Sequence, residues 1–138
     1  MLVTAGSRLL LGRQRAWPAG RYSALAGFVS PGESLEEAVV REVGEEAGVE
    51  IGPPLYVSSQ PWPFPASLMM GFTAPWASGE PRVDADELQD VRWFEREDVR
   101  MAARADDAWE ASGQPGGELL LPPRSAIARR LIEGWVDP

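Results

Sequence analysis

The sequence predicts an α/β fold, an α/β/α sandwich in which helices pack on a mixed β-sheet. Short runs rich in branched and aromatic residues alternate with helical patterns, and neither an internal repeat nor a domain-scale linker interrupts them. Hydrophobic residues make up 44% of the 138 residues, an ordinary content for a folded protein that needs no disulfides. We therefore expect one domain that spans residues 1–138.

The expected elements follow from the periodicity and the turn signals of the chain. Strands are predicted at residues 8–14, 22–29, 55–60, 67–76 and 90–96, and the opening residues 1–6 are expected to belong to a first strand that is incomplete. Helices are predicted at residues 34–48, 96–105 and 125–136, with a surface loop at residues 110–118.

The helix at residues 34–48 has clear end signals. Ser34 suits the N-cap, and Glu37 three residues later completes a capping box. Gly48 suits a left-handed C-cap. The apolar stripe that is expected to dock on the sheet consists of Leu35, Val39, Val43 and Ala47.

Composition excludes several classes of function. The net charge of −8, from 21 acidic and 13 basic residues, disfavours a protein whose main function is to bind the phosphate backbone of nucleic acids. No apolar run approaches the roughly 20 residues of a membrane span, and the N-terminal apolar run is too short for a signal peptide, so we expect a cytoplasmic protein with no membrane partner. Cysteine and histidine are both absent, so any metal must be held by oxygen, and no zinc is expected.

Carboxylates gather where the first long helix is expected. Glu42 and Glu46 lie on one helix face, and Glu45 lies on the neighbouring row. Together with Gly27 and Glu33 at the preceding turn, they form an oxygen cluster of the kind that binds Mg²⁺ or Mn²⁺. Such an ion polarises phosphoryl oxygens and activates a bound water.

The alternative interpretation is a solvated helix face on which Glu37 and Arg41 form a weak surface pair. The spacing argues against it. Gly27, Glu33 and the run from Arg41 to Val49 match the Nudix box at all nine of its specified positions. The chain therefore resembles the Nudix hydrolases, which hydrolyse a nucleoside diphosphate linked to another moiety.

A second motif, "SQPWPFPASLM" at residues 59–69, is similar to the signature of the NADH pyrophosphatases, which split NAD(H) into NMN(H) and AMP. Residues 17–29 and 121–132 are also similar to that branch. Full-length relatives carry an N-terminal domain and a four-cysteine zinc ribbon ahead of this region, so the resemblance is to their catalytic domain alone. Because those relatives dimerise, it also implies a homodimer.

The proline-rich motif can be understood as a binding element. Its prolines fix the backbone, so Trp62 and Phe64 could be displayed for an adenine or nicotinamide ring, while Gln60 and Ser67 offer polar atoms. The alternative is that the two rings fill the core beside a loop. The substrate-binding residues implied by the resemblance are Gln60, Pro61, Trp62, Pro63, Phe64, Pro65, Ala66, Ser67 and, through its main chain, Ala128.

The resemblance also implies roles at the acidic cluster. Glu42 and Glu46 would bind the divalent ions, and Glu45 would bind metal or act as the base. The main-chain carbonyl of Ala26 and the side chain of Glu87 would supply further ligands, although an ordinary acidic loop would also contain Glu87.

Three more residues are expected to support the cluster. Arg41 would orient the glutamates through its guanidinium fork, with a purely structural role as the alternative. Gly27 would allow close backbone approach, and Glu33 would anchor the loop through hydrogen bonds.

The sequence thus predicts a Mg²⁺- or Mn²⁺-dependent NAD(H) diphosphatase. One alternative is a broader dinucleotide pyrophosphatase acting on ADP-ribose, diadenosine compounds or NAD-capped RNA, although the acidic charge argues mildly against long RNA. Another is a non-catalytic nucleotide-binding sensor that has kept the fold.

Overall fold

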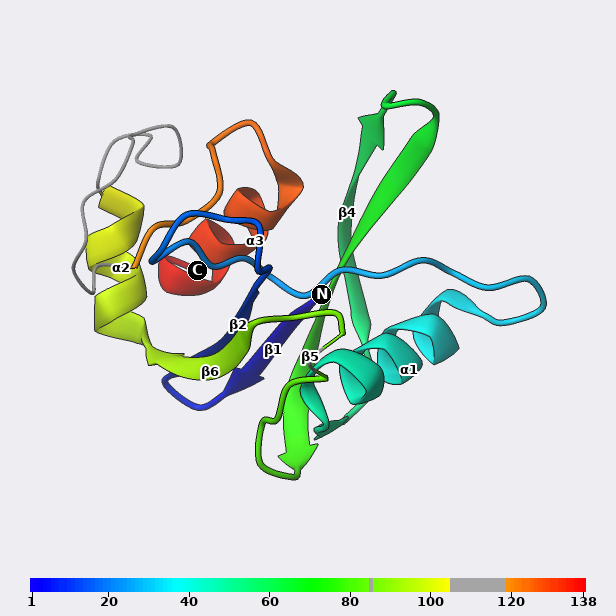
Figure 1. The fold of residues 1–138 in the computed structure, drawn as a ribbon, viewed down its shortest axis with the longest axis horizontal. Coiled ribbons are helices and arrows are strands. Elements are labelled where there is room, and N and C mark those ends of the chain that lie inside the picture. Colours follow the sequence, from blue (N-terminus) through cyan, green and yellow to red (C-terminus); the bar gives the residue numbers. More distant parts are fainter. Residues whose placement is uncertain (85, 105–118) are drawn as a thin grey trace.

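The structure is a computed structural model that describes residues 1–84, 86–104 and 119–138. The predicted loop at residues 110–118 and Ala105, the last residue of the second expected helix, lie outside the described residues. The elements, in chain order (Figure 1), are β1 (Leu2–Ala5), β2 (Arg8–Arg13), α1 (Leu35–Ala47), β3 (Glu50–Ile51), β4 (Leu55–Trp62), β5 (Ser67–Ser78), β6 (Asp90–Glu95), α2 (Arg96–Arg104) and α3 (Ile127–Val136).

The strands form a mixed sheet, as predicted. Their order is β3-β5-β1-β2-β6, and β4 pairs with β5 off this path. The β1–β5 pair is parallel, whereas β1–β2, β2–β6, β3–β5 and β4–β5 are antiparallel. Strand β4 runs on to Trp62, two residues beyond the predicted end, so the proline motif begins inside the long β4–β5 hairpin.

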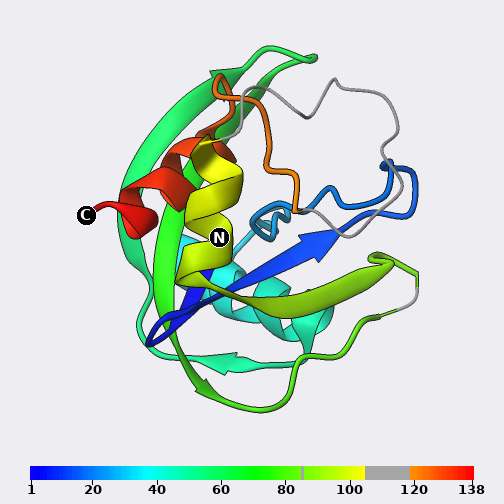
Figure 2. The same ribbon diagram turned by 90° about the vertical axis from the view of Figure 1, so that its left-hand side faces the viewer.

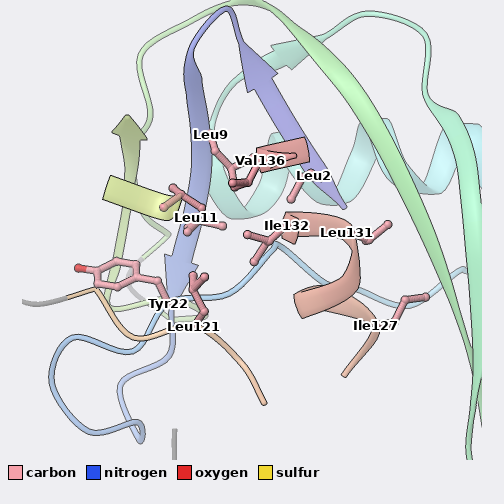
Figure 3. Close-up of a cluster of buried hydrophobic side chains, with 10 residues drawn as sticks. Leu2, Leu9, Leu11, Tyr22, Leu121, Ile127, Leu131, Ile132 and Val136 are labelled. Atoms are coloured by element: carbon pink, nitrogen blue, oxygen red, sulfur yellow. The ribbon is translucent and has the colours of Figure 1, made fainter. Parts of the chain in front are cut away.

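Alternating side chains divide the core between the two faces of the sheet. Leu9 and Leu11 of β2 pack with Ile132 of α3 in one cluster (Figure 3), and Leu10 packs with Val43 of α1 in the other. Figures 1 and 2 show α2 and α3 on one side of β1 and β2, with α1 on the other. The predicted α/β/α sandwich is confirmed.

Helix α1 has the predicted ends. The Glu37 amide donates to Ser34 Oγ at 3.1 Å, the Ser34 amide donates to Glu37 Oε2 at 2.7 Å, and Gly48 adopts φ 67°. Val39, Val43 and Ala47 are buried against the sheet. Leu35, the fourth residue of the predicted stripe, packs half-buried beside them.

The predicted strand at residues 22–29 is wrong. Only isolated bridges form here, Gly12 with Ser23 and Arg21 with Leu120. The apolar pattern has another cause, since Tyr22 is buried in the cluster under α3 and Leu25 in the cluster under α1. These residues anchor a crossing segment to both faces of the sheet rather than pairing it as a strand.

None of the helices in the described part of the chain combines the length and the apolar character that crossing a membrane requires.

Candidate active site

The segment before α1 lies directly against the helix at Gly27. A Cβ built on Gly27 would stand 2.1 Å from both Cδ and Oε2 of Glu42. Separations below 3.0 Å do not occur for real Cβ atoms, so a side chain at residue 27 would force the Glu42 carboxylate to move. The observed position of the Glu42 carboxylate is therefore compatible only with glycine at residue 27.

Arg41 ties the loop before α1 to the helix. Its Nε donates to Glu33 Oε2 at 3.0 Å and its Nη2 to Glu33 Oε1 at 2.6 Å, a two-pronged pairing that fixes both planes. The same Nη2 donates to the Phe28 carbonyl at 2.8 Å, and the Ser30 amide donates to Glu33 at 2.6 Å. The Arg41 guanidinium, with the Ser30 amide, lowers the pKa of the Glu33 carboxyl to about 2.

The remaining nitrogen of Arg41 reaches two of the candidate metal ligands. Nη1 lies 2.7 Å from Glu42 Oε1 and 3.2 Å from Glu45 Oε2. One guanidinium therefore contacts three carboxylates, those of Glu33, Glu42 and Glu45. A weak surface pair with Glu37 is not among these contacts, because Glu37 belongs to the capping box.

Glu46 is the buried carboxylate of the cluster. Only 7% of the residue is exposed, and its Oε2 has no hydrogen-bond partner among the described residues. Burial, together with the charges of Glu42 and Glu87, raises the pKa of the Glu46 carboxyl to about 7. The Met1 amino group and a backbone hydrogen bond with Ala26 act in the opposite direction. Glu46 therefore interacts with the charges of two other candidate ligands, Glu42 and Glu87.

The residues fit a hard divalent ion by chemistry, because every donor is oxygen and one buried carboxylate oxygen is unpaired. No three acidic side chains within the described ranges stand close enough together to hold an ion between them. Arg41 engages Glu42 and Glu45, so a bound cation would compete with this guanidinium for their oxygens. Glu87 lies exposed on the loop before β6.

The candidate substrate motif forms an exposed aromatic tip on the β4–β5 hairpin. Trp62 and Phe64 are 42% and 72% exposed, with ring centroids 5.4 Å apart in an edge-to-face arrangement. The alternative that these rings fill the core is therefore wrong. The other predicted residues of the motif are also exposed: Pro61, Pro63, Pro65, Ala66 and Ser67.

Gln60 joins this hairpin to the start of α3. Its Nε2 donates to the Ser125 carbonyl at 2.7 Å, and its Oε1 accepts from the Ile127 amide at 2.9 Å. Both polar ends of the carboxamide are therefore engaged by main chain. Ala128 follows Ile127 in the first turn of α3 and is half-buried, so the two predicted substrate residues on different elements come to the same end of one helix.

The sequence did not identify Phe28 as a candidate site residue. Phe28 directly follows Gly27 and is 82% exposed. Its apolar neighbours predict a strand, but in the structure Arg41 donates to its carbonyl and its ring is exposed beside the acidic cluster. The available signal was its place between the box glycine and Glu33. Arg82 and Asp84 line a cavity of about 320 Å³ together with Glu45.

Comparisons with known proteins identify the family of the chain. A family profile described as "NUDIX domain" matches residues 1–113. The chain is 47% identical over 131 residues to the NAD-capped RNA hydrolase NUDT12 of Macaca fascicularis, covering 95% of this chain and 27% of that protein. It is 45% identical over 139 residues to the mitochondrial NAD(P)H pyrophosphatase NUDT13 of Mus musculus, covering 99% and 40%.

Among solved structures, the fold is similar to a Nudix-family hydrolase from Clostridium perfringens, with a TM-score of 0.67, 15% identity, and coverage of 99% of this chain and 92% of that one. At that identity the likeness concerns the fold alone. The chain spans well under half the length of the curated relatives it matches. The chain belongs to the Nudix family, in the NAD(H) pyrophosphatase branch that includes both of these relatives.

Proposed function

We propose that this chain hydrolyses the pyrophosphate bond of NAD(H) and releases AMP and NMN or NMNH, with Mg²⁺ or Mn²⁺ as the cofactor. The observation that carries the proposal is the buried Glu46 carboxylate, with an unpaired oxygen and with Glu42 and Glu87 as charged neighbours. A buried carboxylate with like charges beside it costs stability unless something positive compensates it, and a bound cation would supply that compensation.

The residues that would hold the ion are Glu42, Glu46, Glu45 and Glu87, with the carbonyl of Ala26 as a main-chain ligand. When bound, the ion would offset charge on the phosphoryl oxygens and lower the pKa of a water molecule. Gly27 leaves the space that Glu42 occupies, and Arg41 restrains the same side chain from the other side. These two contacts would fix the carboxylate before substrate arrives.

Glu45 suits the role of base better than Glu46. Its side chain is 51% exposed, next to the open cavity at the end of α1, so it can take a proton from an attacking water. The oxygen of that water forms a bond to one phosphorus, and the bond from that phosphorus to the bridging oxygen breaks. The bridging oxygen leaves with the other mononucleotide.

Aromatic side chains provide the surface for the rings of the dinucleotide. Trp62 and Phe64 are held exposed on a proline-rich hairpin at little ordering cost, and the exposed Phe28 lies beside the acidic cluster. In this proposal Ser67 and the main chain at Ala128 contribute polar atoms. Gln60 acts through its two bonds to α3, which fix the hairpin relative to that helix.

A broader dinucleotide pyrophosphatase is the second candidate. The relatives named above are described as an NAD-capped RNA hydrolase and an NAD(P)H pyrophosphatase. The aromatic tip of the hairpin is exposed, so a substrate could bind one ring there while the rest of it extends into solvent. The non-catalytic sensor is disfavoured, because a binding module has no need of the buried charge at Glu46. A homodimer remains a prediction, which the exposed Leu55, Tyr56 and Leu68 of the hairpin support.

The test is a product analysis of this chain with NADH, NAD⁺, ADP-ribose and NAD-capped RNA, each with magnesium, with manganese and with a chelator. We expect AMP and NMNH from NADH only when metal is present, and loss of both products in Glu46→Gln. Turnover that continues in the chelator or in the Glu46→Gln variant would show that the reaction does not use a metal ion at the acidic cluster. Cleavage of ADP-ribose at the same rate as NADH would favour the broader activity.

A further inference from the structure

A second cavity of about 270 Å³ lies between β4 and the start of α3. In Figures 1 and 2 the segment that leads into α3 runs beside the β4–β5 hairpin. The residues that line the cavity are Ser59, Gln60, Pro61, Arg124, Ser125, Ala126, Ile127 and Arg130. We call it the arginine pocket.

The arginine pocket is basic in an acidic protein. Its lining includes two arginines and no carboxylate, although the chain carries 21 acidic and 13 basic residues. Within residues 1–84, 86–104 and 119–138, the guanidinium of Arg130 makes no hydrogen bond or ion pair, whereas its main-chain amide donates to the Ala126 carbonyl. Both charges therefore face a cavity that has no acidic lining to neutralise them.

Arg124 is only weakly paired. Its Nη1 lies 3.8 Å from Glu133 Oε1, and that oxygen already accepts from Arg129 Nε at 2.8 Å. Arg129 itself is 2% exposed and donates two further bonds to main-chain carbonyls, so it is a structural residue whose demands are met. Arg124 therefore shares the Glu133 carboxylate with Arg129. Because its own contact with Glu133 is long, the Arg124 guanidinium stays available to a ligand in the pocket.

The attraction of the pocket for anions rests on these guanidinium groups and not on the end of the helix. The Ile127 amide at the start of α3 already donates to Gln60 Oε1. The side-chain Nε2 of Gln60 is likewise engaged, because it donates to the Ser125 carbonyl. The side-chain donors left to a ligand are the two guanidiniums and the hydroxyls of Ser59 and Ser125.

The position of the pocket relates it to the proposed substrate. Pro61 lines the pocket and directly precedes Trp62, whose exposed ring we propose as a stacking surface. A nucleoside stacked on that ring would place its ribose within reach of the pocket mouth. Forked guanidinium donors match the oxygens of a phosphate group and bind it more strongly than neutral donors do.

We infer that the arginine pocket binds an additional phosphate on the adenosine ribose of the substrate, outside the pyrophosphate bridge. This inference rests on the proposed function and adds a substrate class to it. Two sources carry such a group. A 2′-phosphate distinguishes NADP(H) from NAD(H), and a 3′-phosphodiester joins an NAD cap to its RNA. Either substrate would gain affinity that NADH lacks.

The test uses binding without metal, so that it does not depend on turnover. In the presence of a chelator, calorimetry measures the affinity of the full chain for AMP, adenosine 2′,5′-bisphosphate and adenosine 3′,5′-bisphosphate. We expect one bisphosphate to bind about 10-fold more tightly than AMP, because a hydrogen bond to a charged phosphate is among the stronger polar contacts and is only partly screened by salt. Preference for the 2′ isomer identifies the NADP(H) source, and preference for the 3′ isomer identifies capped RNA.

Variants then locate the effect. Arg130→Gln and Arg124→Gln should each bring the affinity ratio of the preferred bisphosphate to AMP towards 1, and Arg130→Lys should retain part of it. The control is Arg8→Gln, which removes the same charge from the first residue of β2, where Arg8 lies over Trp93 and outside the pocket lining. The control should keep the full ratio, and thermal unfolding checks that each variant is folded.

Equal binding of AMP and both bisphosphates by the unmodified chain would overturn the inference, as would a ratio unchanged in both glutamine variants. Hydrolysis of NADH together with equal binding would overturn the pocket assignment while leaving the proposed function intact. Preference for a bisphosphate in a chain that does not cleave NADH would support the pocket assignment and contradict the proposed function.

Discussion

The carboxyl carbon of Glu42 lies 2.1 Å from the position that a Cβ on Gly27 would occupy. The loop before α1 and the acidic face of α1 are thus fitted to each other at one carboxylate. Arg41 completes the fit, because it binds Glu42 on one side and both Glu33 and the Phe28 carbonyl of the loop on the other. The geometry of the cluster therefore depends on Gly27, Glu33 and Arg41, which are not among the proposed metal ligands.

Substitution at Gly27 tests this fit. Gly27→Ala must displace Glu42, and we expect kcat/KM for NADH to fall by roughly 100-fold, the scale of an ångström displacement at a catalytic group. Gly44→Ala is the matched control within the same motif, since nothing stands within 4 Å of its added Cβ. Because Gly44 lies inside α1, Gly44→Ala should raise the free energy of unfolding by about 0.5–1 kcal/mol. Equal activity in both variants would show that the Glu42 position is unimportant.

Arg41→Lys keeps the positive charge and removes the fork. A lysine cannot bond Glu33 at two points while also reaching Glu42, so the glutamates lose their orientation. We expect kcat to fall by about 10-fold or more with a smaller change in KM, measured by steady-state kinetics. Arg100→Lys is the control, because Arg100 pairs with Glu97 and Asp137 on the α2–α3 side of the molecule. A loss of similar size in both variants would indicate a general effect on stability.

Glu46 makes the metal-free protein sensitive to pH. Its folded-state pKa of about 7 lies above the ordinary value of 4.5, so the folded state holds the proton more tightly than the unfolded state does. The cost of ionisation is absent below pH 4.5, grows as the pH rises towards 7, and is complete above it. The difference corresponds to about 3 kcal/mol at most.

In a chelator, Glu46→Gln should therefore be more stable than the unmodified chain at pH 8, and the difference should shrink towards zero at pH 4.5. Urea unfolding at both pH values measures it. Manganese should reverse the order at pH 8, because only the unmodified chain gains binding energy from the ion. A variant that is less stable at pH 8 without metal would show that the Glu46 carboxylate is not strained by its neighbours.

Phe28 provides a test of the ring surface. Its removal in Phe28→Ala takes away an exposed aromatic face next to the cluster, and stacking of one base contributes about 1–3 kcal/mol, so KM for NADH should rise about 5-fold or more. Val29→Ala is the neighbouring control, 51% exposed and without a π-face. An unchanged KM in Phe28→Ala would assign the ring no part in substrate binding.

Local signals predicted the framework of the site well. The caps and the stripe of α1 depend on residues within one helix, and the glutamate spacing fixes which carboxylates share a face. The crossing segment at residues 22–29 was misjudged, because Tyr22 and Leu25 are buried on opposite faces of the sheet and so imitate a strand pattern. Burial alone does not distinguish a paired strand from a segment pinned between two layers.

Contacts between distant residues could not be predicted. Gln60 bonds to residues 65 and 67 positions away, and nothing in the motif around it indicates that its carboxamide is engaged by α3. The arginine pocket exists only because β4 and the segment before α3 meet in the fold. The homodimer and the cytoplasmic location remain predictions from the sequence.

The central claim, that the acidic face of α1 is a site for a hard divalent ion, is tested most directly by titrating this chain with Mn²⁺ and following free Mn²⁺ by electron paramagnetic resonance at pH 8. We predict saturable binding that magnesium displaces and that Glu46→Gln weakens by at least 10-fold. Binding of equal strength in the folded Glu46→Gln variant, or no binding by the unmodified chain, would contradict it.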